Sequence, residues 1–139
     1  MRAAFSLLAV AMCATAHASP ITLLCQGESA SFPNGFGATS ITSKSSRIFT
    51  LDVTAFTVRA DTTFGTKTAP LATWTNDRTF AFEIPLGVNH GGRLVVSEWG
   101  TINRFTGEIR THYKVEPTET GTLGYSSFTG QCQKAEPKF

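Results

Sequence analysis

The 139-residue sequence contains no uninterrupted apolar run of 18 residues, which a membrane-spanning helix would need. Its 12 basic and 10 acidic residues leave a net charge of only +2, so it lacks the concentrated basic face of a nucleic-acid-binding domain. Charged residues make up only 16% of the chain and apolar residues 41%, a balance that argues against a disordered protein. What is left is one small globular domain that neither spans a membrane nor binds nucleic acid.

The sequence also lacks the short motifs that identify common catalytic and metal sites. It has no G-x-S-x-G nucleophile motif, no H-E-x-x-H zinc motif and no C-x-x-C pair. The histidines His90 and His112 are not at ligand spacing, and solvated surface positions are the expected role of both. We therefore predict no catalytic residue, no metal site and no cofactor.

The amino terminus has the organisation of a secretory signal peptide. Arg2 gives a basic start, Ala3–Cys13 is apolar, and Ala16-His17-Ala18 ends the segment with an A-x-A cleavage site. The apolar part is too short to span a bilayer. The sequence thus predicts a signal peptide over residues 1–18 and an exported domain over residues 19–139, located in the periplasm or outside the cell.

Cysteine is scarce, and its placement is informative. Of three cysteines, Cys13 lies in the predicted signal peptide, so only Cys25 and Cys132 remain in the exported domain. An even number of cysteines in an exported chain favours a disulfide. A Cys25–Cys132 bond requires that the first and last strands lie side by side, with Cα atoms about 4.4–6.8 Å apart.

Apolar and polar residues alternate with a period of two in several short segments, which is the pattern of half-buried strands. The clearest segments are Phe49–Val53, Phe80–Ile84 and Ile109–Val115, and we expect Ile21–Cys25 and Phe128–Cys132 to form the first and last strands. Turn residues separate these segments. The sequence predicts an all-β fold, a single antiparallel small barrel or sandwich of about seven to eight strands, closed by the disulfide.

Three further segments carry weaker signals. Phe32–Ser46 is rich in Gly, Ser and Thr, and we interpret it as a long mobile loop. Pro85-Leu86-Gly87 has the residues of a turn, so we expect the chain to leave the sheet there. Phe56 and Val58 alternate with polar residues and are expected to lie in one strand.

The segment 101–109 has the strongest local signal for a hairpin. Asn103 can accept hydrogen bonds from the turn backbone, and Gly107 can take the left-handed conformation that a four-residue hairpin loop needs at its end. The predicted register pairs Asn103 with Glu108 across this turn. That pairing places Ile102 beside Ile109 and Trp99 beside His112.

In this register Trp99 lies opposite His112, on the polar face of the hairpin. A tryptophan among cations can be a cation–π contact or a contact surface for an acidic partner. We take this face as the candidate binding face; its residues are Trp99, Arg110, His112 and Lys114.

The same register turns Glu98 toward the apolar side, opposite Tyr113, as the one charge out of place in the pattern. A buried carboxylate needs a cation beside it, and Arg59 or Arg78 is the expected partner. Glycoside hydrolysis would need a second carboxylate near Glu98, and Glu83 on the neighbouring strand is the candidate. Glu98 is therefore the predicted buried acid, and the residue on which a hydrolase hypothesis would rest.

Two resemblances bear on location and fold. The W-G-x-I-N-R-x-T-G hairpin of Trp99–Gly107 and the G-x-C ending of Gly130–Cys132 resemble a set of small exported bacterial proteins of unassigned function. The segment Leu24-Cys25-Gln26-Gly27 is more loosely similar to the periplasmic inhibitors of c-type lysozyme, which are small disulfide-tied antiparallel barrels. The first resemblance implies export and a β fold, and the second implies a hydrolase as partner.

The leading functional hypothesis is a non-catalytic binding module of the cell envelope or extracellular space. Its partner would be an unknown protein, a glycan or a small apolar ligand, the last held in an open apolar cavity of lipocalin type. The alternatives are an inhibitor of an exogenous hydrolase such as lysozyme and a small hydrolase that uses Glu98.

Overall fold

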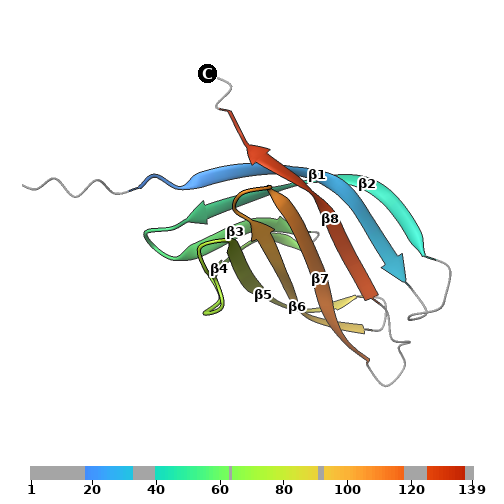
Figure 1. The fold of residues 1–139 in the computed structure, drawn as a ribbon. Helices are drawn as coiled ribbons and strands as arrows, with labels where there is room; N and C mark the ends of the chain where they lie inside the picture. Colours follow the sequence, from blue (N-terminus) through green and yellow to red (C-terminus); the bar gives the residue numbers. More distant parts are fainter. Residues whose placement is uncertain (1–17, 33–39, 63, 91–92, 118–124, 137–139) are drawn as a thin grey trace, which may run out of the picture.

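Eight antiparallel strands form a nearly closed barrel in the computed structural model (Figure 1). Each strand pairs with its neighbour in sequence, except that β4 and β5 barely meet, and β1 pairs with β8. The structure describes residues 18–32, 40–62, 64–90, 93–117 and 125–136. The strands are β1 (Ile21–Phe32), β2 (Ile41–Asp52), β3 (Thr57–Thr62), β4 (Gly65–Pro70), β5 (Thr79–His90), β6 (Arg93–Asn103), β7 (Glu108–Pro117) and β8 (Tyr125–Lys134).

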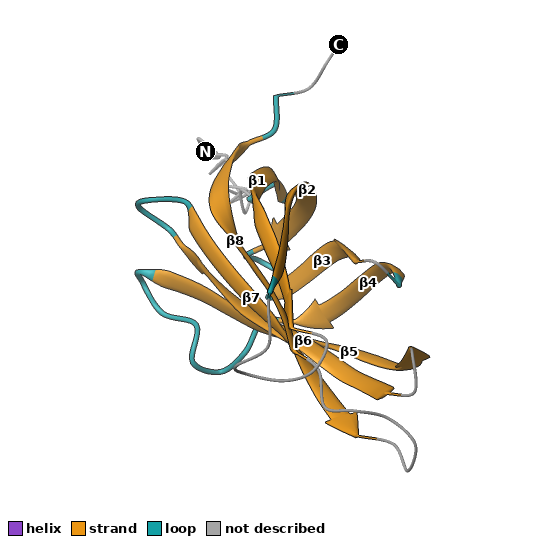
Figure 2. Cartoon of the chain, turned by 90° about the vertical axis from the view of Figure 1, so that its right-hand side faces the viewer, coloured by secondary structure: helices purple, strands orange, loops and turns teal. Residues whose placement is uncertain are grey.

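The predicted fold class is confirmed, and the barrel form replaces the sandwich alternative. The barrel is incomplete where β4 and β5 diverge (Figure 2). Among the described residues, an isolated bridge between Leu71 and Phe82 joins that side. The predicted signal peptide lies outside the described residues, apart from Ala18.

The disulfide joins the first strand to the last, as predicted. Cys25 and Cys132 lie directly opposite each other in the β1–β8 register, with Cα atoms 3.9 Å apart, slightly closer than the expected range. The bond therefore ties the first strand to the last in the middle of the strand order, whose two ends are β4 and β5.

Apolar side chains pack inside the barrel around the disulfide. Phe49 on β2 and Phe82 on β5 are fully buried, with ring centroids 5.6 Å apart. Burying such aromatic and aliphatic side chains supplies the main driving force for folding. Other fully or almost fully buried members of this core are Leu51, Val58, Ala60, Ile84, Ile102 and Ile109.

Three of the weaker predictions are wrong. Residues Ile41–Ser46, interpreted as part of a loop, belong to β2, and β1 extends to Phe32. The Pro85–Gly87 segment does not leave the sheet but shifts the β5–β6 register, with Gly87 at φ 60°. Phe56 lies in the exposed β2–β3 turn and not in a strand, at φ 55°. Two of the turn signals that separate the predicted strands, Pro33-Asn34-Gly35 and Thr120-Gly121, lie outside the described residues.

Two glycines allow β1 and β8 to approach closely beyond the disulfide. Gly27 and Gly130 are partners in the register. A Cβ atom added to Gly130 would lie 2.9 Å from the carbonyl carbon of Gln26 and from the Cα of Gly27, and closer still to the Gln26 oxygen. These are backbone atoms, which cannot move aside as a flexible side chain would.

We expect the substitution Gly130→Ala to lower the free energy of unfolding by about 1–3 kcal/mol, the usual cost of adding a methyl group to a well-packed site. Chemical denaturation monitored by tryptophan fluorescence would measure it. Thr129→Ala is the matched control, because Thr129 is exposed on the neighbouring position of β8, and we expect it to change stability by less than about 0.5 kcal/mol. Equal effects of the two substitutions would contradict this account of the close approach.

Candidate functional site

The barrel interior is divided into an apolar half and a polar half. On β2, Leu51 and Phe49 face the apolar core, and the next positions on the same face are Arg47 and Ser45. On β1 the series runs from Cys25 through Gly27 to Ser29 in the same direction. Because side chains of a strand alternate between its faces, each series is one continuous inward face. The polar half therefore lies at the end of the barrel away from the disulfide.

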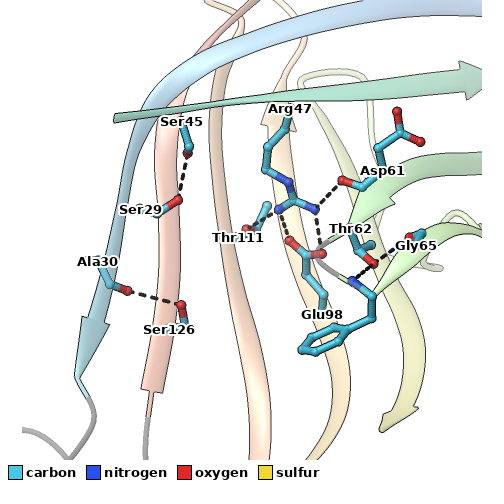
Figure 3. A network of polar contacts seen from close by, with 11 residues as sticks. Ser29, Ala30, Ser45, Arg47, Asp61, Thr62, Gly65, Glu98, Thr111 and Ser126 are labelled. Carbon is cyan, nitrogen blue, oxygen red and sulfur yellow. Dashed lines mark hydrogen bonds and ion pairs between the residues drawn. The ribbon is translucent and has the colours of Figure 1, made fainter. Parts of the chain in front are cut away.

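An ion pair occupies the boundary between the two halves (Figure 3). Arg47 Nη1 donates to Glu98 Oε1, and Arg47 Nη2 donates to Glu98 Oε2 at 2.8 Å. The Glu98 side chain is 0% exposed and that of Arg47 is 10% exposed. A bidentate arginine–carboxylate pair fixes the geometry of both side chains, so neither can turn away without leaving a buried charge.

The surroundings of Arg47 complete its hydrogen bonding. Nη1 also donates to the hydroxyl of Thr111 at 3.3 Å, and Nη2 to the backbone carbonyl of Asp61 at 3.3 Å. The guanidinium carbon lies 4.9 Å from the ring centroid of Phe49 and 5.8 Å from that of Phe128. Burial opposes the charge of Arg47, but the hydrogen bonds and negative charge of Glu98 outweigh it, so the pKa of Arg47 is raised.

A pocket lies beside Arg47, in the polar half of the barrel. Its volume is about 330 Å³. Two hydroxyl contacts lie on its β1 side: Ser29 and Ser45 share a hydrogen bond of 2.8 Å, and Ser126 donates to the carbonyl of Ala30 at 3.3 Å (Figure 3). We call this cavity the polar pocket; it is lined by Ser29, Ser45, Ser46, Arg47, Asp61, Thr62, Tyr113, Ser126, Ser127 and Phe128.

The sequence places Glu98 inside the barrel and opposite Tyr113, and the structure shows both. The expected cationic partner is wrong, however. Arg59 and Arg78 are exposed, and the partner is Arg47, which lay next to the segment interpreted as a loop. The signal that could have found it is its position two residues before buried Phe49, on the same face of one strand.

The second carboxylate expected near Glu98 is not there. Glu83 lies opposite Trp99 on the outer face of the β5–β6 pair, and its carboxylate accepts a hydrogen bond of 2.7 Å from the hydroxyl of Ser97. Glu83 and Glu98 thus point to opposite sides of the sheet. The paired acids of a glycoside hydrolase are not formed by these two residues.

The candidate binding face lies on the outer surface of β6 and β7. Trp99 is 41% exposed, and its ring packs against that of His112 with centroids 4.6 Å apart. Partial burial and the positive charge of Arg110 lower the pKa of His112. Arg110 itself donates to Glu108 at 2.7 Å, which reduces the positive charge of this face. The side chain of Lys114 lies outside the described part of the chain, although its backbone pairs with Ser97.

The β6–β7 turn has the geometry that the sequence predicts. The side-chain oxygen of Asn103 accepts from the backbone N–H of Phe105 at 2.9 Å and of Thr106 at 3.0 Å. Gly107 has φ 72° and donates to the carbonyl of Asn103 at 2.9 Å. This turn holds Phe105 at its tip with 78% of its surface exposed.

The interior of the barrel does not match the apolar cavity that a carrier of lipocalin type would have. The apolar half is filled by side chains such as Phe49 and Phe82, and the pocket in the other half is lined mainly by hydroxyl groups. A second pocket of about 320 Å³ lies beside the β6–β7 turn, where Leu51, Phe80 and Ile102 contribute apolar lining, so the small apolar ligand stays a prediction.

The described part of the chain contains no group of three or more His, Cys, Asp and Glu side chains placed to hold a metal ion. Within the same residues, no helix has the length and hydrophobicity to cross a membrane. The chain matches no protein-family model and no curated protein, so the resemblances seen in its sequence stay predictions.

Proposed function

We propose that this protein is a non-catalytic binding module of the cell envelope or extracellular space, and that the polar pocket holds its ligand. The observation that carries the proposal is the division of the interior. A barrel that needed only stability would gain more from an apolar core throughout, because polar groups lose hydration when they are buried. This chain instead places Ser29, Ser45 and Ser126 on inward positions around a cavity.

The geometry of Glu98 supports a binding role over a catalytic one. A general acid or base must exchange a proton with the substrate, which requires hydrogen-bonding access to it. Both carboxylate oxygens of Glu98 are held by Arg47, and the side chain is fully buried. The side chain of Asp61, near the pocket rim, accepts a 2.7 Å hydrogen bond from Thr66. Glu98 is therefore not placed to act on a bound molecule.

The disulfide supports the proposed location. Disulfides form and persist in oxidising compartments, and the two sulfurs of this barrel are bonded. Location outside the cytoplasm would also explain a domain of this size that is tied at its two ends. Fractionation of expressing cells, followed by mass measurement of the purified protein, tests the location and the cleavage after Ala18 together.

Binding to the pocket can be tested without knowing the ligand. The purified ¹⁵N-labelled protein is titrated with a panel of small sugars, polyols, amino acids, anions and fatty acids, and amide shifts are followed. We expect at least one compound to bind saturably. The amide shifts should be centred on the C-terminal half of β1 and on the N-terminal halves of β2 and β8. Absence of any saturable binding there, or turnover of a hydrolase substrate that Glu98→Gln abolishes, would overturn the proposal.

A second candidate function, inhibition of an exogenous hydrolase, is favoured by the β6–β7 turn. Arg104 lies beside exposed Phe105, and its guanidinium carbon is 4.6 Å from the ring centroid of Phe80. The backbone N–H of Arg104 donates to the carbonyl of Arg78 at 2.8 Å. Because these contacts already fix the turn, exposed Phe105 could insert into a partner with little further loss of conformational entropy.

This candidate predicts that the protein slows c-type lysozyme at equimolar micromolar concentration in a cell-wall lysis assay. Phe105→Ala should remove the effect, while Thr106→Ala, at the neighbouring exposed position of the turn, should not. An unchanged lysis rate with the unmodified protein would exclude lysozyme as the partner.

A further inference from the structure

We infer that the polar pocket recognises a neutral polyhydroxylated ligand, namely a sugar ring, free or at the end of a glycan. The inference deepens the proposed function and rests on it. Three properties of the pocket select this class of ligand: the hydrogen-bonding character of its lining, its charge balance and its size.

The lining groups can both donate and accept hydrogen bonds. A hydroxyl has one donor and two acceptor positions. The single bond shared by Ser29 and Ser45 leaves further capacity on both, and Ser126, which donates to Ala30, keeps its two acceptor positions. Sugar hydroxyls have the same mixed character, so the two sets can satisfy each other in more than one arrangement.

The charge balance disfavours an ionic ligand. Arg47 is the one cation among the described residues that line the pocket, and both of its terminal nitrogens already bind Glu98. An anion that took over these nitrogens would leave the carboxylate of Glu98 buried without its counter-charge. A cation would have to approach the guanidinium, and the carboxylate of Asp61, the other charged residue of the lining, already accepts a hydrogen bond from Thr66. A neutral ligand disturbs neither charge.

Size and shape fit one ring better than a long molecule. The volume of about 330 Å³ is near the lower limit of ordinary ligand sites, about 300–1,000 Å³. The ring of Phe128 and the half-buried side chain of Tyr113 give the wall an apolar portion beside the hydroxyls. The C–H face of a sugar ring can pack against such aromatic surface while its edge hydroxyls bind the serines.

The test compares neutral sugars with a charged sugar, an inorganic anion and a fatty acid. Methyl glucoside and N-acetylglucosamine are titrated into the ¹⁵N-labelled protein beside glucuronate, inorganic phosphate and decanoate. We expect at least one neutral sugar to bind at the pocket, and glucuronate to bind at least tenfold more weakly. A cell-wall glycan fragment that ends in the same sugar separates the two sources, because it binds more tightly only if the pocket serves a glycan end.

Serine variants locate the contacts. Ser45→Ala and Ser126→Ala should each weaken sugar binding about two- to tenfold, the value of one hydrogen bond. Thr129→Ala, on the outer face of β8, should leave the affinity unchanged. Unaltered denaturation midpoints of the serine variants would show that the folded barrel is intact.

The two proposals fail in different ways. If glucuronate, phosphate or decanoate binds the pocket and no neutral sugar does, the inference is overturned and the binding function stands. If no compound of any class shifts the pocket amides, both fall. Sugar binding that is insensitive to both serine substitutions would also overturn the inference, because the contacts would then lie elsewhere.

Discussion

Replacing Glu98 by alanine is expected to lower the free energy of unfolding by about 3–5 kcal/mol, the usual cost of removing one partner of a buried ion pair. The substitution would leave the guanidinium of Arg47, which is 90% shielded from solvent, without the carboxylate that binds both of its terminal nitrogens. Chemical denaturation of the variant and the unmodified protein would measure the difference. A loss of this size is large against the total stability of a small domain, about 5–15 kcal/mol.

Two control variants distinguish the loss of the ion pair from the removal of an acidic side chain. Glu28→Ala removes an exposed acid on the outer face of β1 and should change stability by less than about 0.5 kcal/mol. The double variant Arg47→Met with Glu98→Leu should recover most of the stability lost in Glu98→Ala, because a packed apolar pair needs no counter-charge. If Glu98→Ala costs no more than Glu28→Ala, the ion pair does not contribute as described.

The double variant also bears on why the pair exists. A buried ion pair is weak support for stability, since apolar replacements of the same shape often do as well. If the Arg47→Met, Glu98→Leu protein is as stable as the original but no longer binds the sugar, the pair serves the pocket. The ion pair would then keep the Arg47 side of the polar pocket polar but without net charge. The hydrogen bonds to Thr111 and to the carbonyl of Asp61 would keep Arg47 in place.

The hairpin of β6 and β7 could be predicted almost completely from the sequence. Its turn depends on local chemistry, the side-chain acceptor of Asn103 and the left-handed conformation of Gly107. Once those two positions are fixed, the pairing of Trp99 with His112 and the inward direction of Glu98 follow from strand geometry. Local signals of this kind do not depend on the rest of the fold.

The polar half of the barrel could not be predicted in the same way. Strand patterns are recognised by inward apolar residues, and here the inward residues of β2 change from Leu51 and Phe49 to Arg47 and Ser45. Period two persists, but its contrast between apolar and polar is lost, so Ile41–Ser46 looks like a loop. The inward polar residues that give this part of β2 its place in the pocket are also the reason why its sequence does not look like a strand.

The ion pair was hidden for a second reason. Arg47 and Glu98 are 51 positions apart, and the strands that carry them, β2 and β6, are not neighbours in the sheet. Only closure of the barrel brings the two inward faces together. The alternation of residues along one strand does not show which residue of a distant strand it will contact. The Cys25–Cys132 bond could be predicted because export leaves only two cysteines.

Removing the disulfide with the double substitution Cys25→Ala, Cys132→Ala should lower the free energy of unfolding by about 4–5 kcal/mol in the loop-entropy model. The bonded cysteines are 107 positions apart, so the reduced unfolded chain gains far more freedom than it would from a short loop. The bond also lies in the β1–β8 pair, which joins the first and last strands in the middle of the sheet. Its loss is therefore expected to act first on the pairing of these two strands.

Denaturant unfolding of this variant, and of the unmodified protein with and without reductant, would measure the effect. Reduction should lower the midpoint of the unmodified protein toward that of the variant and leave the variant unchanged, which controls for cavities created by the alanines. Amide exchange should become faster in β1 and β8 before the β6–β7 hairpin is affected, since the hairpin depends on its own turn. Equal midpoints for oxidised and reduced protein, or a mass showing two free thiols in protein purified from the exported fraction, would contradict the role given to this bond.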